Sequence, residues 1–191
     1  MEEKEIKEEK KKKKPNFILE VIIFLVMMFV LRTYVLGTVY VKGSSMEPNF
    51  HHGDLVFVNK LATNIGSPEY GDVVICNVHL SDERENLIKR VIGTPGDEID
   101  LRPKDVDGAR LYDVYLNGEF LEEEYIMEPI GNDGDIDYPY IVPEGCYFVM
   151  GDNRNASTDS RRTSVGAVEK ADLDGEVVFV LYPFDRFGFI S

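Results

Sequence analysis

The chain has 191 residues, of which 43% are hydrophobic and 29% are charged, and it contains 16 glycines and 9 prolines. This composition excludes a collagen-like, coiled-coil or wholly disordered protein. The length allows one domain, or one domain with a sizeable insertion, and it is too short for two full enzyme domains.

The net charge of −14 is distributed unevenly. Seven lysines and five glutamates give residues 1–16 a net charge of +2, whereas 13 basic and 29 acidic residues give residues 33–191 a net charge of −16. A body this acidic repels phosphate backbones, and no basic stripe with interleaved aromatic residues offsets the repulsion. We therefore expect no nucleic-acid partner.

The first predicted element is an apolar helix near the N-terminus. Residues 17–31 carry one charge, Glu20, and the apolar character continues for about 25 residues with only Arg32 added. At about 1.5 Å per residue this is long enough to cross ~30 Å of hydrocarbon. We therefore place a transmembrane anchor at residues 17–37 and expect the lipid bilayer as a partner.

The flanking residues predict how this helix is oriented. Lysines occupy positions 10–14, and a lysine block beside an apolar helix is retained in the cytoplasm. Residues 1–16 are thus expected to form a cytoplasmic tail, with the chain after residue 37 outside the cytoplasm. A cleaved secretory signal is the main alternative, but residues 31–36 are bulky and offer no small-x-small site. A buried helix of a soluble protein fits the lysines poorly.

The rest of the chain consists of short runs rich in Val, Ile, Phe and Tyr, separated by Gly-Asp and Asn-Gly turns. This pattern predicts an antiparallel all-β body. Asn117 and Gly118 predict a two-residue hairpin, because both tolerate positive φ. The expected strands are residues 54–59, 72–78, 87–92, 114–116, 146–150 and 176–182.

The segment from 98 to 140 is more acidic and less apolar than its flanks, so we interpret it as an inserted cap on a β core formed by residues 38–97 and 141–191. Two cysteines, Cys76 and Cys146, lie in apolar runs and are too few for a disulfide scaffold. Buried thiols are the favoured interpretation, and a single bridge stays open.

We expect neither a metal nor a cofactor. The three histidines, His51, His52 and His79, lack the spacing of metal ligands, and the acidic loop at 132–137 lacks the terminal Glu of an EF-hand. The Gly-Thr-Pro-Gly-Asp turn at 93–97 lacks the features of a phosphate-binding loop.

Three segments could carry chemistry. Ser45 follows Gly-Ser and precedes Met-x-Pro on an abrupt turn, Lys89 lies inside an apolar strand, and a polar loop at 151–161 directly follows the strand at 146–150. Each segment alone has an ordinary explanation as a turn, a solvated lysine or a surface loop. Their combination in one chain favours a catalytic site.

Together with the anchor, these segments resemble bacterial type I signal peptidase, the membrane-anchored Ser/Lys protease that removes leader peptides from exported proteins. The resemblance covers most of the chain in order, and it implies the signal peptidase/LexA-like β fold. It is carried by Ser45-Met46-Glu47-Pro48, Gly53-Asp54, Lys89 through Asp97, Gly151-Asp152-Asn153-Arg154, Ser157, Asp159, Ser160 and Arg161.

The resemblance also implies roles for these residues. Ser45 is implied as the nucleophile, Lys89 as the general base, and Ser157 as a hydrogen-bond partner of the lysine. Some members place a second serine hydroxyl two residues before the nucleophile, where this chain has Gly43. The oxyanion is then left to the Ser45 N–H and another local donor, so Gly43 and Ser44 stay candidates. Residues implied to support the site are Met46, Pro48, Arg90, Asp152, Asp159 and Arg161.

The chemistry requires an uncharged lysine, because an ammonium cannot accept the serine proton. Its ordinary pKa of about 10.4 must fall, and burial can lower it by as much as ~3 to 5 units. Strand alternation puts Leu87 and Val91 on the same face as Lys89. We expect Asp152 and Asp159 to be held away from Lys89 by pairing with arginines, Arg90 and Arg161 respectively.

The expected substrate is an extended preprotein segment with small residues at positions −3 and −1, which can add to a free strand edge. Met46 and Phe50 are expected to help the site face lipid. Two other interpretations stay open: a Ser/His hydrolase with one of the three histidines as base, and a non-catalytic membrane-anchored β surface module. Self-cleaving Ser/Lys repressors need a DNA-binding helical domain where this chain has an apolar helix.

Overall fold

A computed structural model of the chain describes residues 16–80 and 83–189, so the expected cytoplasmic tail, apart from Asn16, lies outside the described residues. The first element is the helix α1 (Phe17–Tyr34), which has a mean hydropathy of 2.2 and buries none of its residues against the body. Eighteen residues span about 27 Å. By length and composition, α1 is a candidate membrane span.

The helix is shorter than the expected anchor. It ends at Tyr34, and after Val35 the chain enters strand β1 (Leu36–Tyr40). Residues 36 and 37, counted with the anchor, pair instead with Asn59 and Val58 of the next strand. Hydropathy cannot separate an apolar strand from the end of an apolar helix, and here backbone pairing ends the helix.

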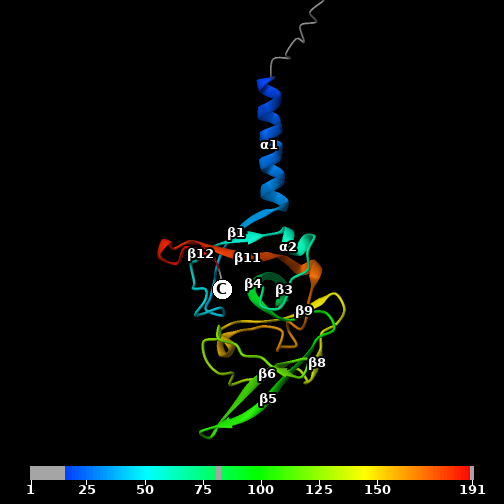
Figure 1. Cartoon of the computed structure of the whole chain (residues 1–191), viewed down its shortest axis with the longest axis vertical. Helices are drawn as coiled ribbons and strands as arrows, with labels where there is room; N and C mark the ends of the chain where they lie inside the picture. The colour runs from blue at the N-terminus through cyan, green and yellow to red at the C-terminus, as the bar shows by residue number, and fades with distance from the viewer. Residues whose placement is uncertain (1–15, 81–82, 190–191) are drawn as a thin grey trace, which may run out of the picture.

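The main sheet is entirely antiparallel. Its order is β1-β2-β11-β3-β4-β9-β10, with β12 beside β11 (Figure 1). The further strands of this sheet are β2 (Leu55–Asn59), β3 (Val73–Leu80), β4 (Glu83–Gly93), β9 (Cys146–Met150), β10 (Val168–Glu169), β11 (Leu173–Tyr182) and β12 (Gly188–Phe189).

A second antiparallel sheet, in the order β7-β6-β5-β8, lies at the end of the molecule opposite α1 (Figure 1). It consists of β5 (Glu98–Val106), β6 (Ala109–Leu116), β7 (Glu119–Phe120) and β8 (Tyr140–Ile141). Apart from Ile141, which was assigned to the core, these strands lie in the segment 98–140 interpreted as an insertion, and we call this part the cap. Asn117 and Gly118 have φ values of 53° and 84° in the β6–β7 turn, so the expected hairpin is confirmed.

Helices are short outside α1. The described residues add α2 (Leu61–Asn64) and three 3₁₀ turns, η1 (Arg154–Ala156), η2 (Lys170–Asp172) and η3 (Phe184–Arg186). The predicted fold class, an antiparallel all-β body preceded by one apolar helix, is therefore confirmed.

The turn between β1 and β2 is fixed by apolar side chains that point inward. Met46 and Phe50 are 1% and 0% exposed, and they pack with Val56, Val58 and Ile88 in one of three core clusters. The expectation that these two side chains face lipid is therefore wrong. Their burial contributes about 1.5–3 kcal/mol each and fixes the turn that carries Ser45.

Both cysteines are free thiols, which excludes the single bridge. Cys76 is buried on β3, and desolvation raises its pKa to about 12 despite the opposing charge of Lys89. Cys146 is half-buried at the start of β9.

Candidate active site

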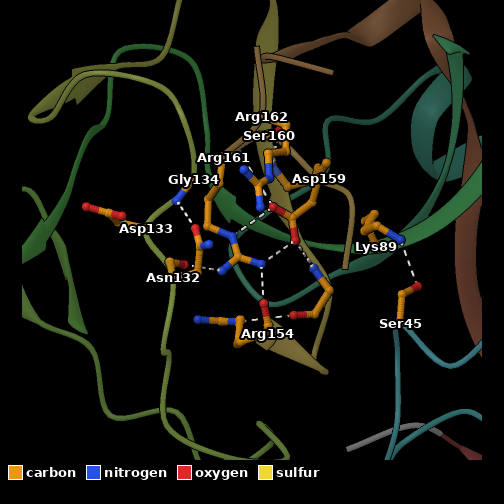
Figure 2. Close-up of polar contacts among 12 residues, drawn as sticks. Ser45, Lys89, Asn132, Asp133, Gly134, Arg154, Asp159, Ser160, Arg161 and Arg162 are labelled. Atoms are coloured by element: carbon orange, nitrogen blue, oxygen red, sulfur yellow. Dashed lines mark hydrogen bonds and ion pairs between the residues drawn. The ribbon is translucent and has the colours of Figure 1, made fainter. Parts of the chain in front are cut away.

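Ser45 and Lys89 meet although 43 residues separate them along the chain. Ser45 lies in the turn after β1, and Lys89 extends from β4 so that its Nζ lies 2.9 Å from Ser45 Oγ (Figure 2). Nζ also donates to the carbonyl oxygen of Ile88 at 2.8 Å. The amine and the hydroxyl are therefore within proton-transfer distance of each other.

Lys89 is only 2% exposed, which is unusual for a lysine. Desolvation by burial lowers its pKa below the ordinary value, and Arg161 adds to the effect. Asp159, Cys76 and Asp152 oppose it by favouring the ammonium. The net direction is toward the uncharged amine, which can accept a proton.

The first of the two nearby carboxylates, Asp152, is paired with Arg90 as expected. Arg90 Nε and Nη2 donate to the two oxygens of Asp152 at 2.9 and 2.8 Å, and both side chains are buried. Arg90 Nη1 also donates to the carbonyl oxygen of Gly71, and its guanidinium lies 4.2 Å from the ring centre of Tyr125. The Asp152 charge is thus neutralised by an arginine rather than by the lysine.

The second carboxylate, Asp159, is paired with Arg161 in the same way, at 2.8 and 2.9 Å (Figure 2). Burial alone would raise the pKa of Asp159, but the hydrogen bonds and charge of Arg161 and the Gly151 N–H outweigh it, so the pKa is lowered. Arg161 also donates to the carbonyl oxygen of Arg154 at 2.6 Å. This network fixes the loop at residues 151–161.

Ser157 differs from expectation. Its Oγ is buried and has no hydrogen-bond partner among the residues that the structure describes, so the expected bond to Lys89 is not formed. The contacts of the Lys89 amine are with Ser45 and with the carbonyl oxygen of Ile88 instead. The Ser157 hydroxyl lies close enough to Asp159 to contribute to the lowering of the pKa of that carboxyl, although their geometry falls short of a full hydrogen bond.

Gly151 and Asn153 are site residues to which sequence reasoning assigned no role. The Asn153 backbone N–H donates to the Ser45 carbonyl oxygen at 3.0 Å, and its side chain donates to the Ser44 carbonyl oxygen at 3.1 Å. A Cβ at Gly151 would lie 2.3 Å from Ser157 Oγ and 2.4 Å from the Ser45 carbonyl oxygen. Both residues lie in the quoted Gly-Asp-Asn-Arg segment, but they act through backbone contacts that residue type alone does not predict.

The cap also contributes a residue that was missed. Glu123 accepts two hydrogen bonds from Arg154, at 2.8 and 2.6 Å, and the side chains of Arg154 and Glu123 are 0% and 5% exposed. Arg154 Nε donates to the Gly151 carbonyl oxygen. In the sequence, Glu123 is the middle of three glutamates in an acidic stretch, and nothing local distinguishes it from its neighbours.

The remaining expected site residues lie around the Ser45 turn. Gly43 has a φ of 85°, and its N–H donates to His52 Nδ1 at 3.2 Å. Ser44 and Pro48 are exposed, whereas Met46 is in the core. Gly43 is therefore required for the turn, because the left-handed region is strained for other residues.

The histidines do not form a base for Ser45. His52 Nδ1 accepts the Gly43 N–H, and the His51 ring contacts Arg186. Within residues 16–80 and 83–189, the hydrogen-bond partner of Ser45 Oγ is Lys89. The same residues contain no group of three His, Cys, Asp or Glu side chains placed to hold a metal ion.

A groove of about 730 Å³ leads to the dyad. It lies between residues 38–42, in and just after β1, and residues 83–89 of β4, with Ile75 at its base and Ser45 and Lys89 in its lining. The strand β1 is an end strand of the sheet, and in the described part of the chain residues 83–89 of β4 pair with β3 alone. Two free strand edges therefore line the groove.

In an antiparallel β body, a serine hydroxyl lies against a buried lysine amine, an arrangement that allows proton transfer from the serine. Comparison with known proteins gives the family: the profile described as "Signal peptidase, peptidase S26" matches residues 15–182.

Similar proteins include signal peptidase I T of Bacillus subtilis (strain 168), 36% identical with 97% of this chain and 96% of the relative covered. Signal peptidase I of Bacillus licheniformis is 35% identical with 94% and 96% covered, and signal peptidase I P of Bacillus subtilis subsp. natto is 33% identical with 94% and 96% covered.

The chain therefore belongs to the signal peptidase family and is a serine peptidase. Members of this family are membrane-associated and remove signal peptides from exported preproteins. Family membership contradicts the interpretation as a non-catalytic surface module.

Proposed function

We propose that the chain is a single-pass membrane-anchored endopeptidase that removes signal peptides with a Ser45/Lys89 dyad. The observation that carries this proposal is the distance of 2.9 Å between Lys89 Nζ and Ser45 Oγ, at a lysine that is 2% exposed and whose pKa is lowered. A serine hydroxyl needs such a base, since it is a weak nucleophile at neutral pH.

In the acylation step, Ser45 Oγ attacks the scissile carbonyl carbon while its proton passes to the lone pair of Lys89 Nζ. The tetrahedral intermediate then collapses, the C–N bond breaks, and the Lys89 ammonium returns the proton to the leaving amine. In deacylation, a water oxygen attacks the ester carbon while a water proton passes to Lys89 Nζ. The C–Oγ bond then breaks, and the Lys89 ammonium returns the proton to Ser45 Oγ. The amine is neutral at the start of each half-reaction.

The developing oxyanion requires N–H or O–H donors. The Ser45 N–H has no hydrogen-bond acceptor among the described residues, so we assign it this role. The Gly43 N–H already donates to His52 Nδ1, so we assign Ser44 as the second donor to the oxyanion.

We assign the unpaired Ser157 hydroxyl to the protonated stage of the reaction. After proton transfer, the Lys89 ammonium carries three N–H groups and needs acceptors. The carbonyl oxygen of Ile88 is one acceptor, and a buried hydroxyl beside the Ser45 peptide supplies another without adding charge. A carboxylate at this position would stabilise the ammonium and raise the pKa of the base.

The groove suits an extended peptide. A preprotein segment lying between β1 and β4 would pair with their free edges and direct alternate side chains into the groove. Its lining includes Ile75 and Ile88, which are buried and apolar, so it suits apolar side chains. We propose small residues at −3 and −1 on the basis of family membership.

The helix α1 would hold the body at the bilayer. The lysines at 10–14 favour the cytoplasm for the N-terminus, which places the catalytic body outside. A preprotein whose leader is already in the same membrane then meets the site at a raised effective concentration.

The test uses the full chain in detergent with a preprotein whose leader ends in Ala-x-Ala. Ser45→Ala and Lys89→Ala are each expected to abolish cleavage, while Ser164→Ala and Lys104→Ala, at exposed positions, retain it. Circular dichroism establishes that all four variants are folded. Retained cleavage by folded Ser45→Ala or Lys89→Ala would refute the dyad.

A further inference from the structure

Tyr125, in the cap between β7 and β8, lies where the cap meets both segments that form the active site. Its ring centre is 4.2 Å from the guanidinium of Arg90 and 6.0 Å from that of Arg154. Arg90 directly follows the base Lys89 on β4, and Arg154 lies in the loop at residues 151–161. One aromatic side chain of the cap therefore contacts an arginine from each segment.

The backbone and the hydroxyl of Tyr125 fix the position of its ring. Asn49, in the turn between β1 and β2, donates through Nδ2 to the Tyr125 carbonyl oxygen at 2.8 Å and to Asp152 Oδ2 at 2.7 Å. The Tyr125 hydroxyl donates to Glu123 Oε1 at 2.7 Å and lies 3.2 Å from the Tyr70 hydroxyl. Desolvation raises the pKa of the Tyr125 phenol, so it keeps the proton that it donates.

The ring completes the surroundings of Arg90. All three guanidinium nitrogens donate: Nε and Nη2 donate to Asp152, and Nη1 donates to the carbonyl oxygen of Gly71. The group also lies over the face of the Tyr125 ring, and such a cation–π contact is strongest where water is excluded. Arg90 is only 4% exposed. The hydrogen bonds fix the direction of the guanidinium, and the ring keeps water and other arrangements from competing with them.

The placement of Arg90 affects the dyad because Arg90 neutralises Asp152. The charged and titratable groups that act on the Lys89 amine come from the loop at residues 151–161 and from β3, and they are Asp152, Asp159, Arg161 and Cys76. Asp159 has its own partner in Arg161. Displacement of Arg90 would leave the Asp152 carboxylate without its partner and admit water, and both changes favour the ammonium form of Lys89.

We propose that Tyr125 is a positioning residue for the dyad, because its ring holds Arg90 on Asp152 and so keeps that carboxylate from stabilising the Lys89 ammonium. The proposal rests on the proposed function of Lys89 as the base. Of the described residues, those that line the groove between β1 and β4 all lie outside the cap. Tyr125 thus gives the cap a part in the reaction without a contact to the peptide.

The test compares three variants of the full chain in detergent. Tyr125→Leu removes the ring, whereas Tyr125→Phe keeps the ring and removes the hydroxyl. Tyr140→Leu is the matched control, because Tyr140 is also a half-buried aromatic residue of the cap but packs against Phe148, with ring centres 5.4 Å apart. One measurement is the exchange of the Arg90 Nε proton with water, by NMR of ¹⁵N-labelled protein. The other is the pH dependence of kcat and KM for a short peptide.

We expect Tyr125→Leu to speed exchange of the Arg90 Nε proton about tenfold or more and to raise the midpoint of the pH–kcat profile by about half a pH unit or more. On the acid side of the profile, kcat then falls about threefold or more, while KM stays unchanged because the groove is intact. Tyr125→Phe and Tyr140→Leu should keep the wild-type exchange rate and midpoint, and thermal unfolding measures any loss of stability that they cause.

A protected Arg90 proton or an unshifted midpoint in folded Tyr125→Leu would overturn the proposal and leave Tyr125 as a packing residue. An equal shift in Tyr125→Phe would assign the effect to the hydroxyl, and an equal shift in Tyr140→Leu would assign it to general loosening of the cap, so either result also overturns it. Retained cleavage by Lys89→Ala would refute the dyad, whereas the Arg90 proton reports the contact with the ring whichever residue is the base. The two failures are therefore distinguishable.

Discussion

Lys89 must lose its proton before it can accept the proton of Ser45, and burial in β4 lowers its pKa. Since the folded pKa lies below the ordinary value of about 10.4, the uncharged fraction and the activity rise with pH through that lowered pKa. We predict that kcat/KM increases about tenfold per pH unit on the acid side and levels off below the ordinary range of lysine.

The measurement is a pH–rate profile with a short peptide substrate. Lys89→Arg is expected to be inactive throughout, because a guanidinium cannot be deprotonated in this range. A profile whose midpoint falls at or above the ordinary lysine pKa would contradict a desolvated base.

Gly151 is a second residue on which the site depends. A Cβ there would approach the Ser45 carbonyl oxygen and Ser157 to less than 2.5 Å, so we predict that Gly151→Ala destabilises the protein by about 1–3 kcal/mol and removes most activity. Gly131→Ala is the control, since its Cβ would meet Asn155 Oδ1 at an ordinary 3.4 Å. Thermal unfolding and peptide cleavage measure both effects, and equal behaviour of the two variants would show that the loop has room to move.

At the scale of elements, the ion pair of Glu123 and Arg154 joins the cap to the loop at residues 151–161. Removal of the carboxylate leaves a buried guanidinium without a countercharge, so we predict that Glu123→Ala lowers the free energy of unfolding by about 3–5 kcal/mol. Glu124→Ala, at an exposed neighbouring position, should change it little. Denaturant unfolding compares the two, and similar losses would indicate a general charge effect of the acidic stretch.

The six strands expected from the sequence all overlap observed strands, because each combines β-branched or aromatic residues with flanking turns. The other observed strands were not among those expected. Of these, β1 is as apolar as the helix before it, β5 contains Pro103 and five consecutive exposed positions, and β8, β10 and β12 have two residues each. Composition cannot end the helix at Tyr34, whereas pairing of β1 with β2 does. Short strands and the ends of elements depend on tertiary partners and not on local pattern.

The site, like the fold, could be predicted from the sequence only in part. Ser45 and Lys89 could be identified from the sequence because they lie in long ordered motifs. The arginine partners of Asp152 and Asp159 could be predicted because a carboxylate in contact with Lys89 would stabilise its ammonium form. The contact of Asn153 with the Ser45 backbone could not be predicted, since it joins two loops more than a hundred residues apart. The bond expected from Ser157 to Lys89 is absent, and the amine contacts Ser45 and the carbonyl oxygen of Ile88 instead.

At the scale of the whole molecule, the body is held close to the end of α1. Val35 alone separates the helix from β1, and its carbonyl oxygen accepts the Lys60 N–H. We predict that about ten flexible residues inserted between Tyr34 and Val35 slow cleavage of a membrane-inserted preprotein severalfold, because the tether lengthens and the body is freed to turn.

Cleavage of a short soluble peptide should be unchanged by this insertion. The same insertion in the β5–β6 turn at Asp107 and Gly108 should affect neither substrate. Equal slowing of both substrates by the first insertion would mean that it perturbs the fold rather than the placement of the body.

The two free strand edges along the groove also bear on solubility. Unpaired backbone groups on β1 and β4 can form hydrogen bonds with any extended segment, including the same edge of another copy of the chain. Such edges are common starting points of aggregation. The end of β4 farthest from Lys89 carries three exposed charged side chains, Glu83, Arg84 and Glu85. Charged side chains on an edge strand discourage pairing with the edge of another sheet. The enzyme thus keeps an incomplete sheet open to its peptide while charged side chains at the entrance discourage its own copies from completing it.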